Sequence, residues 1–265
     1  MMYPFIEERG RGMSEARVMA GAEPFYAEGD NNVGVLVSHG YTGSPQSMRP
    51  LAQGLAEEGF TVALPRLKGH GTTPADMATT TANDWVADIE SAAAWLRERC
   101  DALFMAGLSM GGTLTLYMAG RHPEMFRGIV PINAAVFVDN PDLAELAFMA
   151  DAPAEVPGVG NDVKAPGVTE LAYPVVPVPT VKELFALFKA TEELLPRVAC
   201  PVLAMVARED HVVPPPNTEY VLGRVASADK EALWLEDSYH VSTLDNDKDL
   251  ILRRTTDFVR RHTAK

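Results

Sequence analysis

A serine between two glycines stands at residues 107–111 (GLSMG), which fit the G-x-S-x-G pattern of a nucleophile elbow. A serine hydroxyl is a weak nucleophile at neutral pH, so it needs exposure on a sharp turn and a base within reach. The residues before it, 102–106 (ALFMA), read as a buried strand, and residues 113–120 (TLTLYMAG) read as a helix. Because this strand-turn-helix context is the one that such an elbow requires, the sequence predicts that Ser109 is a catalytic nucleophile rather than part of a structural glycine-rich turn.

Such a serine needs a general base and an acid that orients the base. In hydrolases with this kind of elbow, the chain order is the serine, then an aspartate or glutamate, then the histidine. Asp210 directly follows a predicted strand at residues 201–207 (PVLAMVA), and His240 follows another at residues 231–235 (EALWL). Loops at the carboxyl ends of parallel strands meet at one edge of a sheet, so both side chains are expected beside Ser109.

Neighbouring side chains leave an alternative for the acid. Glu209 precedes Asp210, which is favoured by its position in the turn and by the Val-Val-Pro-Pro sequence that follows. His211 is not expected to be the base, because it precedes the last strand, and Asp237 is interpreted as a turn or solvated acid. The remaining histidines are expected to be turn, core or surface residues; they are His39, His70, His122 and His262.

The negative charge that develops on the substrate oxygen needs fixed hydrogen-bond donors. The backbone N–H of Met110, directly after the serine, is expected to be one donor, and the other is expected from the loop after the first parallel strand. That loop is SHGYTGSP at residues 38–45, where the N–H of Tyr41 suits the role. An ordinary tight turn is the alternative interpretation of this loop, and the Tyr41 ring could also line the pocket.

The elements that must position these residues alternate between strand and helix along most of the chain. Apolar runs predict buried strands at residues 33–38, 60–64, 102–106, 126–132, 201–207 and 231–235. Helical spacing of apolar residues predicts helices at residues 47–58, 83–99 (with Asn83 as N-cap), 113–120, 217–225 and 247–261. This alternation favours an α/β fold with a mostly parallel sheet and helices on both faces.

The alternation breaks over residues 135–196. Two stretches there, 141–150 and 181–195, have helical spacing, and six prolines between them exclude long helices and central strands. A structureless loop of this length is uncommon inside a domain, so a small lid inserted over the active site is predicted, with an irregular surface excursion as the alternative. The predicted organisation is an arm at residues 1–20, a core at 21–134 and 197–265, and the lid at 135–196.

Composition narrows the class of protein. The 265 residues are 47% hydrophobic, enough for one large domain, and the formal net charge of −13 disfavours binding to nucleic acid or anionic membranes, which require basic patches. No apolar stretch approaches the roughly 20 residues that span a bilayer, and the first 21 residues do not read as a signal peptide. No metal or cofactor motif is present, and the two cysteines, Cys100 and Cys200, are expected to be free thiols in the cytoplasm.

Five motifs, HGYTGSP, PRLKGHGTTP, GLSMGG, AREDHVVPP and DSYHV, occur in this order. Together they resemble the α/β-hydrolase superfamily, and more closely its small bacterial carboxylesterases and monoacylglycerol lipases, over residues 21–258. The resemblance implies an α/β-hydrolase fold with a short lid and no cofactor. It also implies a triad of Ser109, Asp210 and His240, and oxyanion N–H groups at Tyr41 and Met110. His70, in the GHGTTP motif, is expected to be structural. The unusual lid sequence VVPVPTV means that the family's acyl-chain preference is not implied.

These observations predict a serine hydrolase that cleaves short- to medium-chain acyl esters or monoacylglycerols through an acyl-enzyme. A thioesterase, an amidase or an acyltransferase uses the same triad and stays an alternative, as does a non-catalytic binding protein of this fold. The small-molecule substrate is expected to carry an apolar acyl group, and the oligomeric state is not indicated. Apolar lid residues offer a surface for that group; they are Phe137, Leu143, Leu146, Phe148, Met149, Leu184, Phe185, Leu187 and Phe188.

Overall fold

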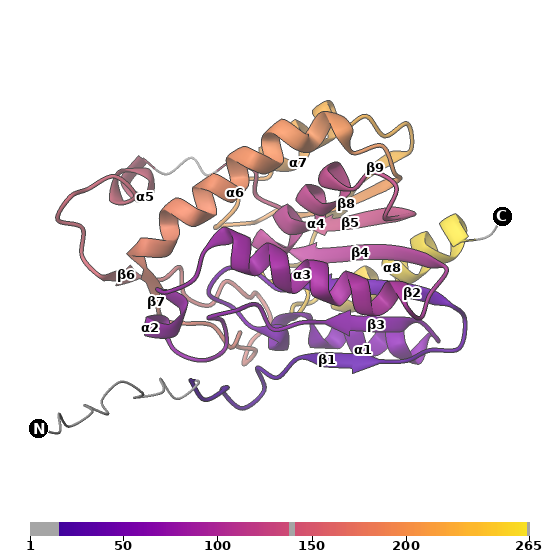
Figure 1. The fold of residues 1–265 in the computed structure, drawn as a ribbon, viewed down its shortest axis with the longest axis horizontal. Helices are drawn as coiled ribbons and strands as arrows, with labels where there is room; N and C mark the ends of the chain where they lie inside the picture. Colours follow the sequence, from indigo (N-terminus) through magenta and orange to yellow (C-terminus); the bar gives the residue numbers. More distant parts are fainter. Residues whose placement is uncertain (1–15, 138–140, 264–265) are drawn as a thin grey trace, which may run out of the picture.

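A seven-stranded sheet forms the centre of the structure, a computed structural model that describes residues 16–137 and 141–263 (Figure 1). Its strands lie in the order β1-β3-β2-β4-β5-β8-β9. Six of them run parallel, and β1 pairs antiparallel with β3 at one edge. The strands are β1 (Phe25–Ala27), β2 (Val33–Ser38), β3 (Thr61–Leu64), β4 (Ala102–Leu108), β5 (Gly128–Ile132), β8 (Val202–Ala207) and β9 (Lys230–Leu235).

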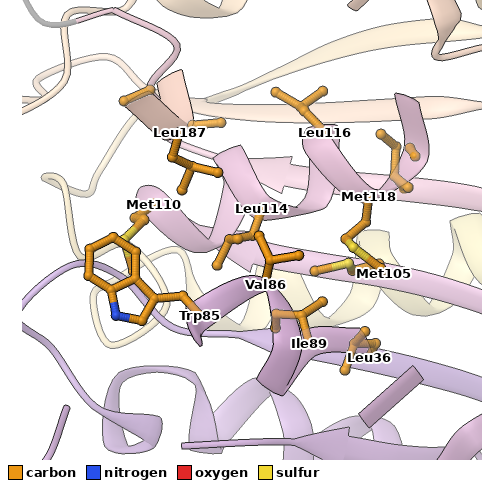
Figure 2. Packing of buried hydrophobic residues seen from close by; sticks show 14 of the residues in the cluster. Leu36, Trp85, Val86, Ile89, Met105, Met110, Leu114, Leu116, Met118 and Leu187 are labelled. Carbon is orange, nitrogen blue, oxygen red and sulfur yellow. The ribbon is translucent and has the colours of Figure 1, made fainter. Parts of the chain in front are cut away.

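Helices cover both faces of this sheet (Figure 1). One face carries α3 (Ala82–Arg97), α4 (Met110–Arg121), α6 (Val181–Leu194) and α7 (Pro216–Arg224), and the other carries α1 (Arg49–Glu57) and α8 (Lys248–Thr263). Strand β2 shows why the apolar run is continuous. Leu36 packs into the cluster under α3 and α4, shown in Figure 2, whereas Val35 and Val37 pack against α1 and α8. Because both faces are covered, each residue of the strand is buried.

Outside residues 135–196, the expected strands and helices are present; β2 has the expected bounds, and the ends of the others differ by at most three residues. Helix α3 begins after Thr81 and not after Asn83, which corrects the predicted cap. The Thr81 hydroxyl accepts a hydrogen bond from the Asp84 N–H, and the Asp84 carboxylate accepts one from the Thr81 N–H, a reciprocal capping box. The short elements β1 and α2 (Pro74–Met77) were not expected, because three or four residues carry too little periodicity.

Residues 135–196 contain the helices α5 (Pro141–Leu146) and α6 and a separate two-stranded sheet of β6 (Glu155–Pro157) and β7 (Val175–Pro177). Helix α5 is shorter than the predicted stretch 141–150. Helix α6 packs on α4, where a Cβ atom on Gly120 would lie 2.7 Å from the Leu194 carbonyl oxygen. This close approach fixes α6 to the body of the molecule. The boundaries of a core and a lid stay a prediction, and residues 1–15 of the predicted arm lie outside the described residues.

No helix within the described ranges has the length and apolar character needed to cross a membrane. Cys100 and Cys200 are both free thiols.

Candidate functional site

Ser109 lies on the turn between β4 and α4, with backbone angles φ +55° and ψ −120°. A positive φ is unusual for a residue with a side chain and stores strain that surrounding contacts must hold. The Ser109 N–H donates to the Ile132 carbonyl oxygen of β5 at 2.9 Å, which ties the turn to the sheet. The backbone therefore has the tight elbow that the glycine-flanked serine predicted.

Gly111 is required by close backbone packing in this elbow. A Cβ atom there would lie 2.3 Å from the Ser38 carbonyl oxygen and 2.7 Å from that of His39. Ser38 is the last residue of β2 and His39 follows it, so neither oxygen can move without displacing the loop after the strand.

We expect Gly111→Ala to lower the free energy of unfolding by about 1–3 kcal/mol, because the added methyl group overpacks this contact. The measurement is urea unfolding of the purified protein. Gly223→Ala is the matched control, since its Cβ in α7 would meet no atom within 4 Å; it should be neutral or raise stability by up to about 1 kcal/mol. Equal stability of Gly111→Ala and the wild type would contradict the packing argument.

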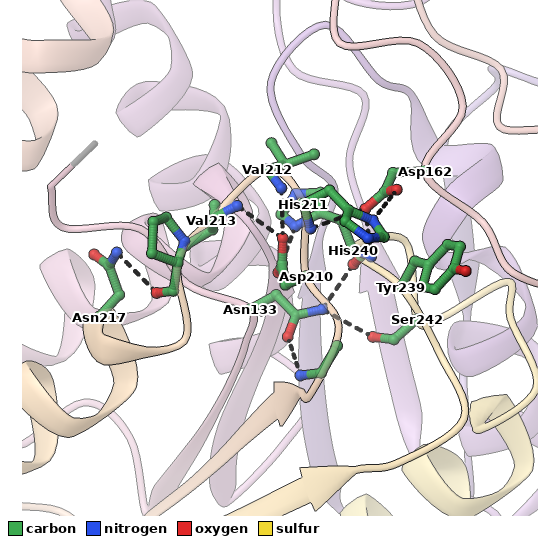
Figure 3. A network of polar contacts seen from close by, with 12 residues as sticks. Asn133, Asp162, Asp210, His211, Val212, Val213, Asn217, Tyr239, His240 and Ser242 are labelled. Atoms are coloured by element: carbon green, nitrogen blue, oxygen red, sulfur yellow. Dashed lines mark hydrogen bonds and ion pairs between the residues drawn. The ribbon is translucent and has the colours of Figure 1, made fainter. Parts of the chain in front are cut away.

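His240 and Asp210 form a buried hydrogen-bonded pair, with 2.8 Å between His240 Nδ1 and Asp210 Oδ2. The side chain of His240 is 8% exposed and that of Asp210 is 1% exposed. The second oxygen, Asp210 Oδ1, accepts hydrogen bonds from the N–H groups of Val212 and Val213 at 2.8 and 2.7 Å (Figure 3). These bonds orient the carboxylate toward the ring.

The charge state of His240 follows from these neighbours. Burial acts most strongly and lowers the pKa of the ring, because it disfavours the charged form. The hydrogen bond that the ring donates to Asp210 and the negative charges of Asp210, Glu170 and Asp162 act in the opposite direction and leave the pKa above its usual value. Such a ring accepts a proton readily.

Asn133 holds the two loops that carry this pair, and the sequence reasoning did not identify it. Its Nδ2 donates to the His240 carbonyl oxygen at 2.7 Å, and its Oδ1 accepts the Ala207 N–H at 2.7 Å (Figure 3). The residue is buried at the end of β5 with φ +44°. A single asparagine after an apolar strand has no spacing that distinguishes it, so only the structure reveals this contact.

The predicted oxyanion loop lies against the elbow. A Cβ atom on Gly40 would lie 3.4 Å from Ser109 Cβ, and Tyr41 and Met110 line the same cavity as Ser109. The Tyr41 hydroxyl is turned away into a hydrogen bond with Thr180 Oγ1, and its ring packs edge-on against Trp85. The hydroxyl is therefore not directed at the predicted oxyanion site. If Tyr41 donates a hydrogen bond there, its backbone N–H is the donor.

We expect Tyr41→Phe to leave kcat nearly unchanged, because the proposed donor is the backbone N–H and not the hydroxyl. Thr180 keeps a partner in this variant, since its hydroxyl also donates to the Pro177 carbonyl oxygen. Steady-state ester hydrolysis provides the measurement. A loss of about 10²- to 10³-fold, as for removal of an oxyanion donor, would identify the hydroxyl as the donor instead.

Two buried histidines support this loop. His39 Nδ1 lies 3.0 Å from the Gly40 carbonyl oxygen, and His39 Nε2 accepts the Leu67 N–H at 3.2 Å. Burial lowers the pKa of His39 to about 3 and that of His70, whose ring packs edge-on against His39, to about 4. Both rings are neutral at physiological pH. The structural role expected for His70 from the sequence stays a prediction.

Ser109 and His240 line one cavity of about 230 Å³, with Asp210 behind the histidine. Residues of the predicted lid close it; the apolar ones include Val156, Pro157, Val176, Val181, Leu184 and Phe188. Only some of the apolar residues that were expected to face a substrate line this cavity. Leu143 also lines the cavity, whereas Leu187 packs in the core and Phe148 is exposed.

Glu170 is a polar residue of this cavity that the sequence reasoning missed. Burial raises the pKa of its carboxyl group, although the nearby His240 ring acts to lower it. It lies in the proline-rich stretch, far in sequence from the motifs, so no local pattern marks it. A larger open groove of about 900 Å³ lies at the opposite, amino-terminal ends of the strands and contains none of these residues.

Within residues 16–137 and 141–263 no group of three or more histidine, cysteine or acidic side chains is placed to hold a metal ion.

Comparison with known proteins identifies relatives of the chain. Residues 30–156 and 163–247 match the family described as serine aminopeptidase, S33. A thermostable monoacylglycerol lipase of Bacillus sp. strain H-257 is 49% identical over 248 residues, which cover 93% of this chain and 98% of the relative. A carboxylesterase of Bacillus subtilis strain 168 is 26% identical over 238 residues, or 89% of this chain and 96% of the relative.

Solved structures are similar in fold. One from a study of LipS and LipT, two metagenome-derived lipolytic enzymes, is 62% identical with a TM-score of 0.91, covering 93% of this chain and 100% of the other. A soluble variant of monoglyceride lipase from Saccharomyces cerevisiae is 18% identical with a TM-score of 0.76 over 100% of both chains and supports the fold alone. The family match spans most of the chain and confirms the predicted resemblance. The chain is therefore a hydrolase of the carboxylesterase and lipase type with the α/β-hydrolase fold, and it belongs to the serine aminopeptidase S33 family.

Proposed function

We propose that the chain hydrolyses monoacylglycerols and related short- to medium-chain carboxylic esters through an acyl-enzyme on Ser109. The observation that carries this proposal is the cavity that Ser109, on a strained elbow, shares with His240, whose buried ring is bonded to Asp210. A nucleophile, a base and an orienting acid are the three groups that acyl transfer to serine requires.

The proposed reaction begins when Ser109 Oγ attacks the ester carbonyl carbon while His240 accepts the hydroxyl proton. Asp210 stabilises the imidazolium that forms, and the N–H groups of Tyr41 and Met110 hold the oxyanion, each lowering the barrier by about 2.7–4 kcal/mol. His240 then protonates the leaving alcohol, and the C–O bond breaks to leave the acyl-enzyme. A water molecule, deprotonated by His240, then attacks the acyl carbonyl carbon. The bond to Ser109 Oγ breaks as His240 returns the proton to that oxygen, which releases the acid and restores Ser109.

The lining of the cavity supports the substrate class. Its apolar wall suits an acyl chain, and its volume lies below the roughly 300–1,000 Å³ of pockets for drug-sized ligands, which favours short to medium chains. Glu170 and Asp162 are polar groups in this wall, and Glu170 can form a hydrogen bond with a hydroxyl of the alcohol portion. The Bacillus relative at 49% identity is named a monoacylglycerol lipase, which agrees with an acyl chain on a small polyol.

Amide hydrolysis is the second candidate, because the matched family is described as serine aminopeptidases. Thioester cleavage and acyl transfer to another alcohol use the same three residues and belong to the same alternative. A non-catalytic binding role is disfavoured, since the three proposed catalytic positions are all occupied by competent residues.

The test is a substrate panel assayed with the purified protein. It contains 1-monoacylglycerols, the methyl esters of the same acids, p-nitrophenyl esters from acetyl to palmitoyl, a matched acyl thioester and aminoacyl p-nitroanilides. We expect the largest kcat/KM for esters of short or medium acyl length, and a higher value for the monoacylglycerol than for the methyl ester of the same acid. Turnover of the anilides alone would contradict the proposal and indicate an aminopeptidase instead.

We also propose a cytoplasmic location, without stable membrane insertion and without nucleic-acid binding. The two free thiols are typical of a reducing compartment, and the net charge of −13 opposes binding to polyanions.

A further inference from the structure

Residues 161–173, here called the strap, connect β6 to β7 and run between two loops of the proposed active site. On one side the strap is bonded to the oxyanion loop. The Tyr173 N–H donates to the Thr42 carbonyl oxygen at 3.0 Å, and Ser44 Oγ donates to the Leu171 carbonyl oxygen at 2.9 Å. The strap therefore spans from the oxyanion loop toward the loop of His240.

Asp162 makes the contact with the loop of His240. Asp162 Oδ2 accepts the His240 backbone N–H at 3.0 Å, and the Asp162 carbonyl oxygen accepts the Val241 N–H at 3.1 Å. Asp162 Oδ1 lies 2.8 Å from His211 Nδ1, so the same carboxylate also holds the loop that carries Asp210 (Figure 3). The Asp162 side chain is only 13% exposed. One carboxylate thus bonds both loops of the His240–Asp210 pair.

A second carboxylate, that of Asp245, lies between His240 and α8 in the chain and accepts hydrogen bonds from the strap. It is 1% exposed and accepts the backbone N–H groups of Lys164 and Ala165 in the strap, at 2.7 and 2.8 Å. It also accepts the Tyr239 N–H at 2.9 Å, next to His240. Strap and histidine loop are therefore joined twice, which fixes Asp162 relative to the ring.

We propose that Asp162 is a positioning residue for the reaction: its carboxylate fixes the backbone of His240 and places a negative charge beside the base. This inference rests on the proposed role of His240 as the general base. It assigns a function to a residue of the inserted segment, which the motifs of the chain do not mark. It also means that the strap is bonded to both loops of the proposed active site.

The negative charge of Asp162 predicts a specific change in the pH dependence of activity. His240 must be neutral to accept the Ser109 proton, so activity is lost as the pH falls through the pKa of His240. The carboxylates that face the ring are Asp210, Glu170 and Asp162, and each raises this pKa against the lowering effect of burial. Removing the charge of Asp162 must therefore lower the pKa and extend activity to lower pH.

The experiment compares Asp162→Asn, Asp162→Ala and the wild type. Asparagine keeps an oxygen that can accept the His240 N–H but has no charge, whereas alanine loses both. We expect the acidic limb of kcat/KM to move to lower pH in both variants. We expect kcat to fall by about 10- to 100-fold in Asp162→Ala, as for a displaced catalytic group, and by less in Asp162→Asn, with little change in KM.

Asp237→Asn is the matched control. Asp237 precedes His240 in the same loop, but its side chain is 67% exposed and pairs with Lys164. Its charge is screened by solvent, so we expect the acidic limb to stay in place. NMR titration of the His240 ring, assigned with a His240→Gln variant, gives the same comparison without substrate. There too the pKa should be lower in Asp162→Asn than in the wild type.

An unchanged His240 titration in Asp162→Asn, together with unchanged kcat of the folded Asp162→Ala protein, would overturn the proposal. Thermal unfolding of each variant provides the folded fraction. Failure of the proposed function would look different, since the wild type would then show no ester turnover, while the NMR titration would still report whether Asp162 acts on His240.

Discussion

Replacing Ser109 by alanine is expected to lower kcat for ester hydrolysis by about 10⁵- to 10⁶-fold. Only the hydroxyl group is lost, and among the described residues no other serine and no cysteine lines the cavity. The fold should persist, because the elbow is held by backbone contacts such as the Ser109 N–H to the Ile132 carbonyl oxygen. The measurement is kcat for a p-nitrophenyl ester with a protein whose unfolding transition matches that of the wild type.

Ser91→Ala is the matched control for this variant, since its hydroxyl bonds only the Ala87 carbonyl oxygen on the exposed side of α3. It should keep wild-type activity. Mass spectrometry of the wild type with a slowly deacylated ester should show the acyl group on the peptide that contains Ser109. Substantial turnover by the Ser109→Ala protein would show that another residue is the nucleophile.

Replacing Asp210 by asparagine is expected to lower kcat by about 10⁴-fold. The Asp210 carboxylate accepts the N–H of His240 Nδ1 and leaves Nε2 free to accept a proton from the serine. An amide at this place can present its NH₂ group to the ring, which favours the other tautomer and removes the charge that stabilises the imidazolium. The same loss of charge lowers the pKa of His240, so the residual activity should extend to lower pH.

Glu209→Gln separates the two acids that the sequence left open. The Glu209 side chain is 51% exposed and pairs with Lys164 on the surface, whereas Asp210 is bonded to His240. We expect Glu209→Gln to keep nearly full activity with a wild-type pH profile. A large loss in this variant, with little effect of Asp210→Asn, would reverse the assignment of the acid.

Much of the fold was predictable because its signals are local. A strand buried on both faces needs a continuous apolar run, and the runs at β2, β4 and β8 were recognised for this reason. The elbow was recognised because only glycine leaves room for backbone atoms as close as 2.3 Å. Helix ends were harder to predict, since several polar residues near an end can serve as the cap. Thr81 rather than Asn83 caps α3, because the Asp84 carboxylate accepts the Thr81 N–H while the Thr81 hydroxyl accepts the Asp84 N–H.

The composition of the site was predictable only in part. Ser109, Asp210 and His240 each lie in the turn or loop that follows a strand, β4, β8 or β9. Because the carboxyl ends of parallel strands meet at one edge of a sheet, these positions were enough to predict that the three lie together. Leu184, Leu187 and Phe188 share one helix with the same apolar spacing, and all three are buried in the core. Only Leu184 and Phe188 also line the cavity. Periodicity identifies an apolar stripe but not the surface that the stripe meets.

The sequence by itself determined which residues could perform acyl transfer and that a mostly parallel sheet would carry them, because both properties depend on residues close together in the chain. The tertiary structure alone decided what holds those residues in place. Asn133, Asp162 and Glu170 reach His240 from 70 to 107 positions away. A single polar residue has no periodicity, and its partner is chosen by the packing of the whole chain, which no local pattern records.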